Sequence, residues 1–139
     1  MKMNSKGFTL IELLAVIVIL AVIALIATPL IMGVIDDAKK GSAENTAYGF
    51  GKAVENAIAT QMITDTTFAP TSPIKSNTTI AGTTTGNVAA TAKIDYKGTQ
   101  PTDVNLIIVN GVVSKDSTIT VDGYKFKMND KSKWVFQAS

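Results

Sequence analysis

The chain has 139 residues, which suffice for one domain with a modest core but not for two ordinary domains. It contains neither Cys nor His, which excludes disulfides, thiolate metal sites and the commonest general base. Two of its 13 basic residues lie in the first six positions, and the other 11 balance the 11 acidic residues, so net charge does not favour nucleic acid as a partner. We expect a non-enzymatic protein without metal or cofactor.

The N-terminal quarter combines a short basic segment with a long apolar run. Residues 1–7 read MKMNSKG, and residues 8–35 carry one charge, Glu12. About 20 apolar residues in a helix cross a hydrocarbon core of ~30 Å. The sequence therefore predicts a membrane-spanning helix over residues 8–35.

Two residues near the end of this run weaken a helix. Pro29 removes one helical hydrogen bond and clashes with the preceding turn, at a cost of roughly 3 kcal/mol in an ordinary helix. Gly33 weakens the next turn. We expect a kink or a meltable segment between residues 24 and 33.

Residues 36–62 are polar but keep a helical period. Apolar side chains recur every three or four residues and form one stripe, as on an amphipathic helix that packs by one face. The stripe consists of Ala43, Ala47, Phe50, Val54, Ile58 and Met62.

The rest of the chain changes from helix to strand patterns. Residues 63–91 are rich in Thr, Ala, Gly, Asn and Pro and predict a long irregular connection with at most a short strand. From residue 92 onward, two-residue alternation, an apolar segment over 104–109 and two tight-turn dipeptides predict an antiparallel sheet. The dipeptides are Asn110-Gly111 and Asp122-Gly123, and the later strands are predicted over 124–128 and 134–137.

The position of Glu12 needs an explanation, because a charge inside an apolar helix usually has a partner or a function. A signal peptide cut after its apolar core would end in small residues, and that pattern is missing here. A plain membrane anchor would keep Glu12 wet at headgroup level. A third interpretation is a cut between Gly7 and Phe8, which creates an amine four residues before Glu12. A staggered neighbour could then offer its amine to this carboxylate.

The segment Lys6-Gly7-Phe8-Thr9-Leu10-Ile11-Glu12-Leu13, followed by the apolar run, resembles the class III leader of type IV prepilins. The resemblance covers residues 6–35. It implies cleavage after Gly7 by a prepilin peptidase, N-methylation of Phe8, and Glu12 as the assembly carboxylate. It also implies an α+β pilin-like fold, with a long N-terminal helix packed on a C-terminal antiparallel sheet.

The resemblance further implies where the chain acts and with what. The precursor would be a single-pass protein of the cytoplasmic membrane with its N-terminus inside, and the product a subunit of an extracellular filament. Its partners would be identical or related pilins, the peptidase and the pilus assembly platform. Adhesion, motility or biofilm formation would follow. A pseudopilin of a secretion or DNA-uptake apparatus and a monomeric membrane-anchored binding module are the alternatives.

Two weaker features remain on the predicted head. Lys125, Lys127, Lys131 and Lys133 are interleaved with acidic residues, which is typical of a solvated strand face. Asn77-Thr78-Thr79 fits the N-glycosylation pattern, but such short matches are frequent by chance, so we interpret it as a surface loop.

Overall fold

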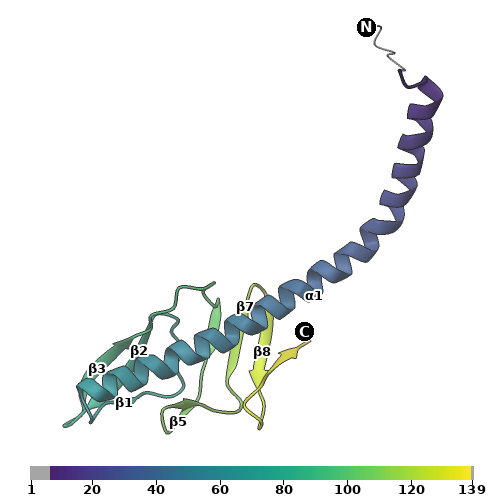
Figure 1. Ribbon diagram of the computed structural model, residues 1–139. Coiled ribbons are helices and arrows are strands. Elements are labelled where there is room, and N and C mark those ends of the chain that lie inside the picture. Colours follow the sequence, from purple (N-terminus) through teal and green to yellow (C-terminus); the bar gives the residue numbers. More distant parts are fainter. Residues whose placement is uncertain (1–6, 139) are drawn as a thin grey trace, which may run out of the picture. The chain divides into compact units, whose positions relative to one another are not determined.

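The computed structural model describes residues 7–138, and the basic residues Lys2 and Lys6 of the predicted leader lie outside them. One helix, α1 (Leu10–Thr64), is followed by nine short strands (Figure 1). The chain divides into two compact units, Met1–Lys39 and Lys40–Ser139, and α1 contributes to both. We describe each unit by itself.

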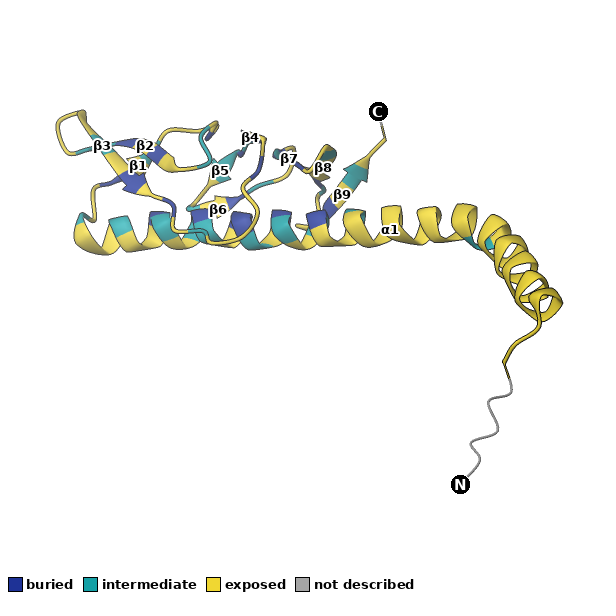
Figure 2. Cartoon of the chain, turned by 90° about the horizontal axis from the view of Figure 1, so that it is seen from above, coloured by how far each residue is buried: buried dark blue, intermediate teal, exposed yellow. Residues whose placement is uncertain are grey.

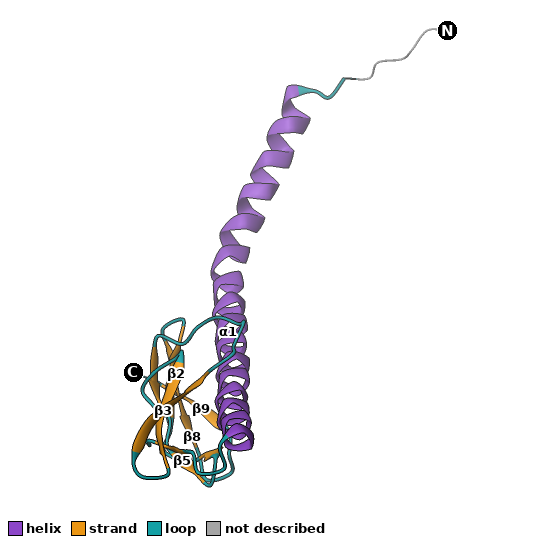
Figure 3. Cartoon of the chain, turned by 90° about the vertical axis from the view of Figure 1, so that its left-hand side faces the viewer, coloured by secondary structure: helices purple, strands orange, loops and turns teal. Residues whose placement is uncertain are grey.

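The strands of the second unit form three antiparallel sheets. The first is β1-β2-β3, from β1 (Ala69–Pro70), β2 (Thr79–Thr84) and β3 (Val88–Lys93). The second is β4-β7-β8-β9, from β4 (Asp103–Asn105), β7 (Thr118–Val121), β8 (Tyr124–Met128) and β9 (Trp134–Gln137). The third pairs β5 (Ile108–Val109) with β6 (Val112–Val113). All three lie on one side of the second half of α1 (Figure 3).

The core of this unit is the contact between the helix stripe and the inner faces of the sheets. The stripe residues from Ala43 to Ile58 are buried, whereas Met62 is 37% exposed. Figure 2 shows the buried positions of α1 on the side that faces the strands. Opposite them, Ile80, Ile119 and Phe126 are almost completely buried. The predicted α+β fold, a long helix packed on antiparallel sheets, is therefore confirmed.

The predicted tight turns are also present. Asn110 and Gly111 have φ values of 53° and 78°, and Asp122 and Gly123 have 49° and 85°. Positive φ at both central residues matches the twist of a two-residue hairpin. These turns connect β5 to β6 and β7 to β8.

Two parts of the strand pattern differ from expectation. Residues 63–91, predicted as an irregular connection, contain β1, β2 and most of β3. On β2 one of the two buried positions is Gly82, where an added Cβ would lie 2.5 Å from the Ala69 carbonyl oxygen, so the two faces of this strand differ little in hydrophobicity. The apolar segment 104–109, predicted to belong to the sheet, is not one continuous strand but is split between β4 and β5. The backbone of Leu106 turns away to pair with Ile74.

Ser117, directly before β7, is hydrogen-bonded through its side chain to the backbone of two neighbouring segments. Its side chain is fully buried, donates a hydrogen bond to the Ser114 carbonyl (2.7 Å) and accepts one from the Ile107 N–H (2.9 Å). Without the hydroxyl, the Ile107 N–H would lose its hydrogen-bond acceptor at a partly buried position. An unsatisfied buried donor costs about 1–3 kcal/mol.

Ser117→Ala is therefore expected to lower the free energy of unfolding by about 1–3 kcal/mol. Urea unfolding of the full chain in detergent, followed by the fluorescence of the single Trp, would measure this. Ser42→Ala, at an exposed helix position, is the matched control and should change stability by only a few tenths of a kcal/mol. Equal unfolding midpoints for the two variants would contradict the structural role of Ser117.

Candidate processing and assembly site

The site predicted from sequence lies where α1 begins. Gly7, Phe8 and Thr9 precede the helix in non-helical conformation, and Phe8 is 90% exposed. A Cβ added to Gly7 would meet no described atom within 4 Å. The peptide bond between Gly7 and Phe8 thus lies in an exposed segment outside the helix, which is what a protease needs to reach it.

Thr9 and Glu12 form a capping box around the first turn of α1. The Thr9 N–H and hydroxyl both donate to Oε2 of Glu12, at 2.8 Å and 3.0 Å. The Glu12 N–H donates in return to the Thr9 hydroxyl at 3.3 Å. This reciprocal arrangement satisfies backbone donors that would otherwise be orphaned at the helix start.

The capping box fixes the position of the carboxylate and leaves part of it available. Both hydrogen bonds from Thr9 end on Oε2, and no described residue donates to Oε1. A second donor from outside the chain could therefore bind Oε1 without breaking the cap. The sequence analysis did not use this feature, although the spacing Thr-x-x-Glu before an apolar run predicts it.

The apolar run that follows is exposed along almost its whole length. Large side chains such as Leu25, Leu30 and Val34 are 77%, 74% and 65% exposed, and no residue of this segment is buried. Within the described residues, this is the one helix long and apolar enough to cross a membrane. Such a surface requires an apolar surrounding, either lipid or other helices.

The helix α1 continues past both residues that were expected to weaken it. Pro29 and Gly33 lie inside α1 without interruption. The hydroxyl of Thr28, the residue before the proline, donates a hydrogen bond to the Ala24 carbonyl at 2.7 Å. This carbonyl therefore has a side-chain partner in the turn that precedes Pro29. The kink expected between residues 24 and 33 stays a prediction.

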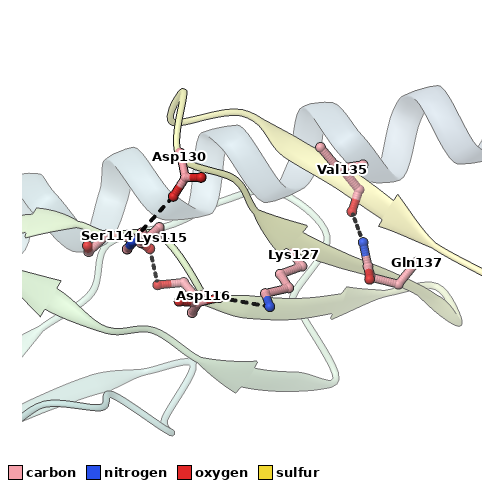
Figure 4. Close-up of polar contacts among 8 residues, drawn as sticks. Ser114, Lys115, Asp116, Lys127, Asp130, Val135 and Gln137 are labelled. Atoms are coloured by element: carbon pink, nitrogen blue, oxygen red, sulfur yellow. Dashed lines mark hydrogen bonds and ion pairs between the residues drawn. The ribbon is translucent and has the colours of Figure 1, made fainter.

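Lys127, one of the four lysines noted on the head, and the nearby Lys115 are each paired with an acidic residue. Lys127 contacts Asp116 at 2.8 Å and Lys115 contacts Asp130 at 3.4 Å (Figure 4). The hydrogen bond from Lys127, followed by its positive charge, lowers the pKa of the Asp116 carboxyl. Opposite charges interleaved in this way give a solvated face rather than a polyanion groove.

Two further features of the described residues concern metal binding and glycosylation. Among the described residues, no group of three or more Asp or Glu side chains could hold a metal ion. The amide of Asn77, in the glycosylation pattern, donates to the Pro101 carbonyl at 3.0 Å and is partly buried. That contact holds part of the side chain against the fold.

Comparison with known proteins supports the sequence-based interpretation of the N-terminus. Residues 2–28 match the model of the prokaryotic N-terminal methylation motif. No curated protein matched the chain, and no solved structure matched it either. The matched segment contains the predicted cleavage position, Phe8, Glu12 and most of the apolar run.

Proposed function

Because the chain carries an N-terminal methylation motif typical of type IV pilin and pseudopilin families, we propose that it is a subunit of a type IV filament. The observation that carries this proposal is the motif match, which continues directly into an exposed apolar helix. Residues 1–7 are the leader in this proposal. A prepilin peptidase cuts after Gly7 on the cytoplasmic side and methylates the new amine of Phe8.

The apolar helix has two successive environments in this mechanism. Before cleavage, residues 8–35 span the cytoplasmic membrane as a single-pass anchor. After cleavage, the assembly platform extracts the subunit, and the same residues pack against equivalent helices of other subunits. Each Leu, Ile or Val kept out of water contributes roughly 1.5–3 kcal/mol, so apolar contact keeps an assembled subunit from dissociating into water.

Glu12 supplies the register between subunits. Cleavage leaves a cationic amine on Phe8, and Oε1 of a neighbouring Glu12 can accept its hydrogen bond while Oε2 stays in the capping box. An amine or a carboxylate left unpaired in an apolar core is strongly destabilising, whereas a close pair offsets much of this cost. The axial stagger that brings amine to carboxylate is therefore favoured over other staggers.

The finer proposal is a pilus on the cell surface, acting in adhesion, motility or biofilm formation. A pseudopilin would share the motif and the helix, but it would form a short structure within the envelope. Labelling of intact cells with antibodies against the head, followed by electron microscopy, tests the proposal. Label along surface fibres supports a pilus, whereas label that appears only after the envelope is opened contradicts it.

A further inference from the structure

The outer edge of β3 is open. The Ile94 N–H donates to the Thr78 carbonyl at 2.9 Å, which makes Ile94 and Thr78 a hydrogen-bonded pair of the β2–β3 ladder. Such pairs alternate along antiparallel strands. The N–H and C=O groups of Lys93, Thr91 and Ala89 therefore point away from β2. The β1 side of β2 agrees with this phase: Ala81, which lies opposite Thr91, accepts a hydrogen bond at its carbonyl from the Thr71 N–H and not from β3.

Several other edge positions of the head are protected. An outward N–H on an edge strand is a template for pairing with another chain, and folded proteins usually remove or cover it. On β1 the outward position is Pro70, which has no N–H. Elsewhere a side chain accepts the hydrogen bond: Ser72 from Ile108 (3.0 Å), Glu55 from Val113 (3.0 Å) and the Tyr48 hydroxyl from Trp134 (3.2 Å).

The edge of β3 has none of these protections among the described residues. No hydrogen bond uses the outward N–H groups of Ala89, Thr91 or Lys93. The strand contains no proline, and Lys93 is its only charged residue. A hollow of about 550 Å³ lies between this end of β3 and α1, and its helix side is lined by the small residues Ala53 and Ala57 and by longer side chains such as Lys52 and Gln61. The edge therefore has room for an approaching backbone.

We propose that β3 pairs with β3 of a second copy of this chain, antiparallel and centred on Thr91. This register places Thr91 opposite Thr91 and each Lys93 opposite an Ala89. The two ammonium groups then lie at opposite ends of the new ladder, so like charges do not face each other. The two three-stranded sheets join into one across a two-fold axis, with the same edge used by both copies.

This symmetry determines which copies can meet. A two-fold axis through an antiparallel pair reverses the direction of residues 40–64 of α1 in the partner. Subunits of one polar filament all point the same way, so neighbours within a filament cannot form this contact. The pairing joins heads of opposite polarity, as in two filaments that lie antiparallel. It thus extends the proposed function to lateral association, although the contact itself does not depend on cleavage or polymerisation.

The absence of native Cys allows a direct test by cross-linking. In the purified full chain in detergent, Thr91→Cys should form covalent dimers under mild oxidation, because directly opposed residues have Cα atoms about 5.5 Å apart. Ala89→Cys and Lys93→Cys should each stay monomeric, since equivalent positions lie roughly 13 Å apart. A mixture of these two variants should cross-link with a short bismaleimide, and adding Thr91→Lys to both should reduce that yield several-fold.

Thr99→Cys, in an exposed loop outside the strands, gives the level of random collision. Dimer formation by Thr91→Cys several-fold above this level, with the stated register, supports the proposal. Equal yields from Thr91→Cys and Thr99→Cys would overturn it. So would cross-linking of Thr91→Cys to a different protein in cell extracts, since the edge would then receive a foreign strand. Because the assay needs no filaments, its failure would leave the proposed function standing.

Discussion

Glu12→Gln is expected to remove the chain from surface-sheared filaments while leaving it in the membrane. Gln can replace Glu in a capping box, so the helix start is kept and only the negative charge is lost. The amine of the neighbouring subunit would then stay unpaired in an apolar core. An uncompensated buried charge costs about 3–5 kcal/mol, which corresponds to more than a hundredfold in association. Immunoblots of sheared and membrane fractions measure the partition.

Thr9→Val separates assembly from helix capping. It removes the hydroxyl that bonds to Glu12 but keeps the carboxylate and the Thr9 backbone N–H. Loss of a cap costs about 1 kcal/mol, so filaments should persist at reduced yield. If Glu12→Gln assembles as well as the native chain while Thr9→Val does not, the carboxylate acts only as a cap and the charge-pairing mechanism is wrong.

Phe50→Ala is expected to destabilise the head more than any exposed substitution. Phe50 is fully buried on the helix stripe, and its ring meets Tyr96 edge-on with a centroid distance of 5.6 Å. Removing a buried Phe side chain costs about 3–5 kcal/mol, a large part of the 5–15 kcal/mol that stabilises a typical domain. Urea unfolding followed by fluorescence of Trp134, which lies against Gly51 of the same helix, would show the shift.

Asn45→Ala is the matched control on the exposed face of the same helix. Ala is a good helix former, so stability should stay the same or rise by a few tenths of a kcal/mol. Phe50→Leu should lie between the two, because it keeps much of the buried volume. Indistinguishable unfolding of Phe50→Ala and Asn45→Ala would show that the stripe does not hold the helix to the sheets.

Periodic and local patterns predicted most of the fold. The stripe from Ala43 to Ile58 and the turns at Asn110 and Asp122 depend on short-range spacing, which the sequence displays directly. The first sheet was harder to predict because a buried position of β2 is Gly82, which differs little in hydrophobicity from its neighbours Ala81 and Thr83. A period-two pattern needs contrast between the faces, and small residues provide almost none.

Contacts between distant residues could not be predicted in this way. The Tyr48 hydroxyl accepts a hydrogen bond from the Trp134 N–H, 86 positions away, which explains a tyrosine that lies off the main stripe. The division of residues 104–109 depends on pairing with Ile74, another long-range contact. At the N-terminus, by contrast, the spacing of Thr9 and Glu12 contained the capping box, and it could have been predicted.

The most direct test of the central claim is intact mass combined with N-terminal peptide mapping of the chain from surface-sheared material of its native host. Our account predicts a chain that begins at Phe8 and carries one methyl group on its amine, together with an unprocessed form in the membrane. A chain that begins at Met1 and occurs only in the membrane would contradict it, and would indicate an anchored domain that does not form filaments.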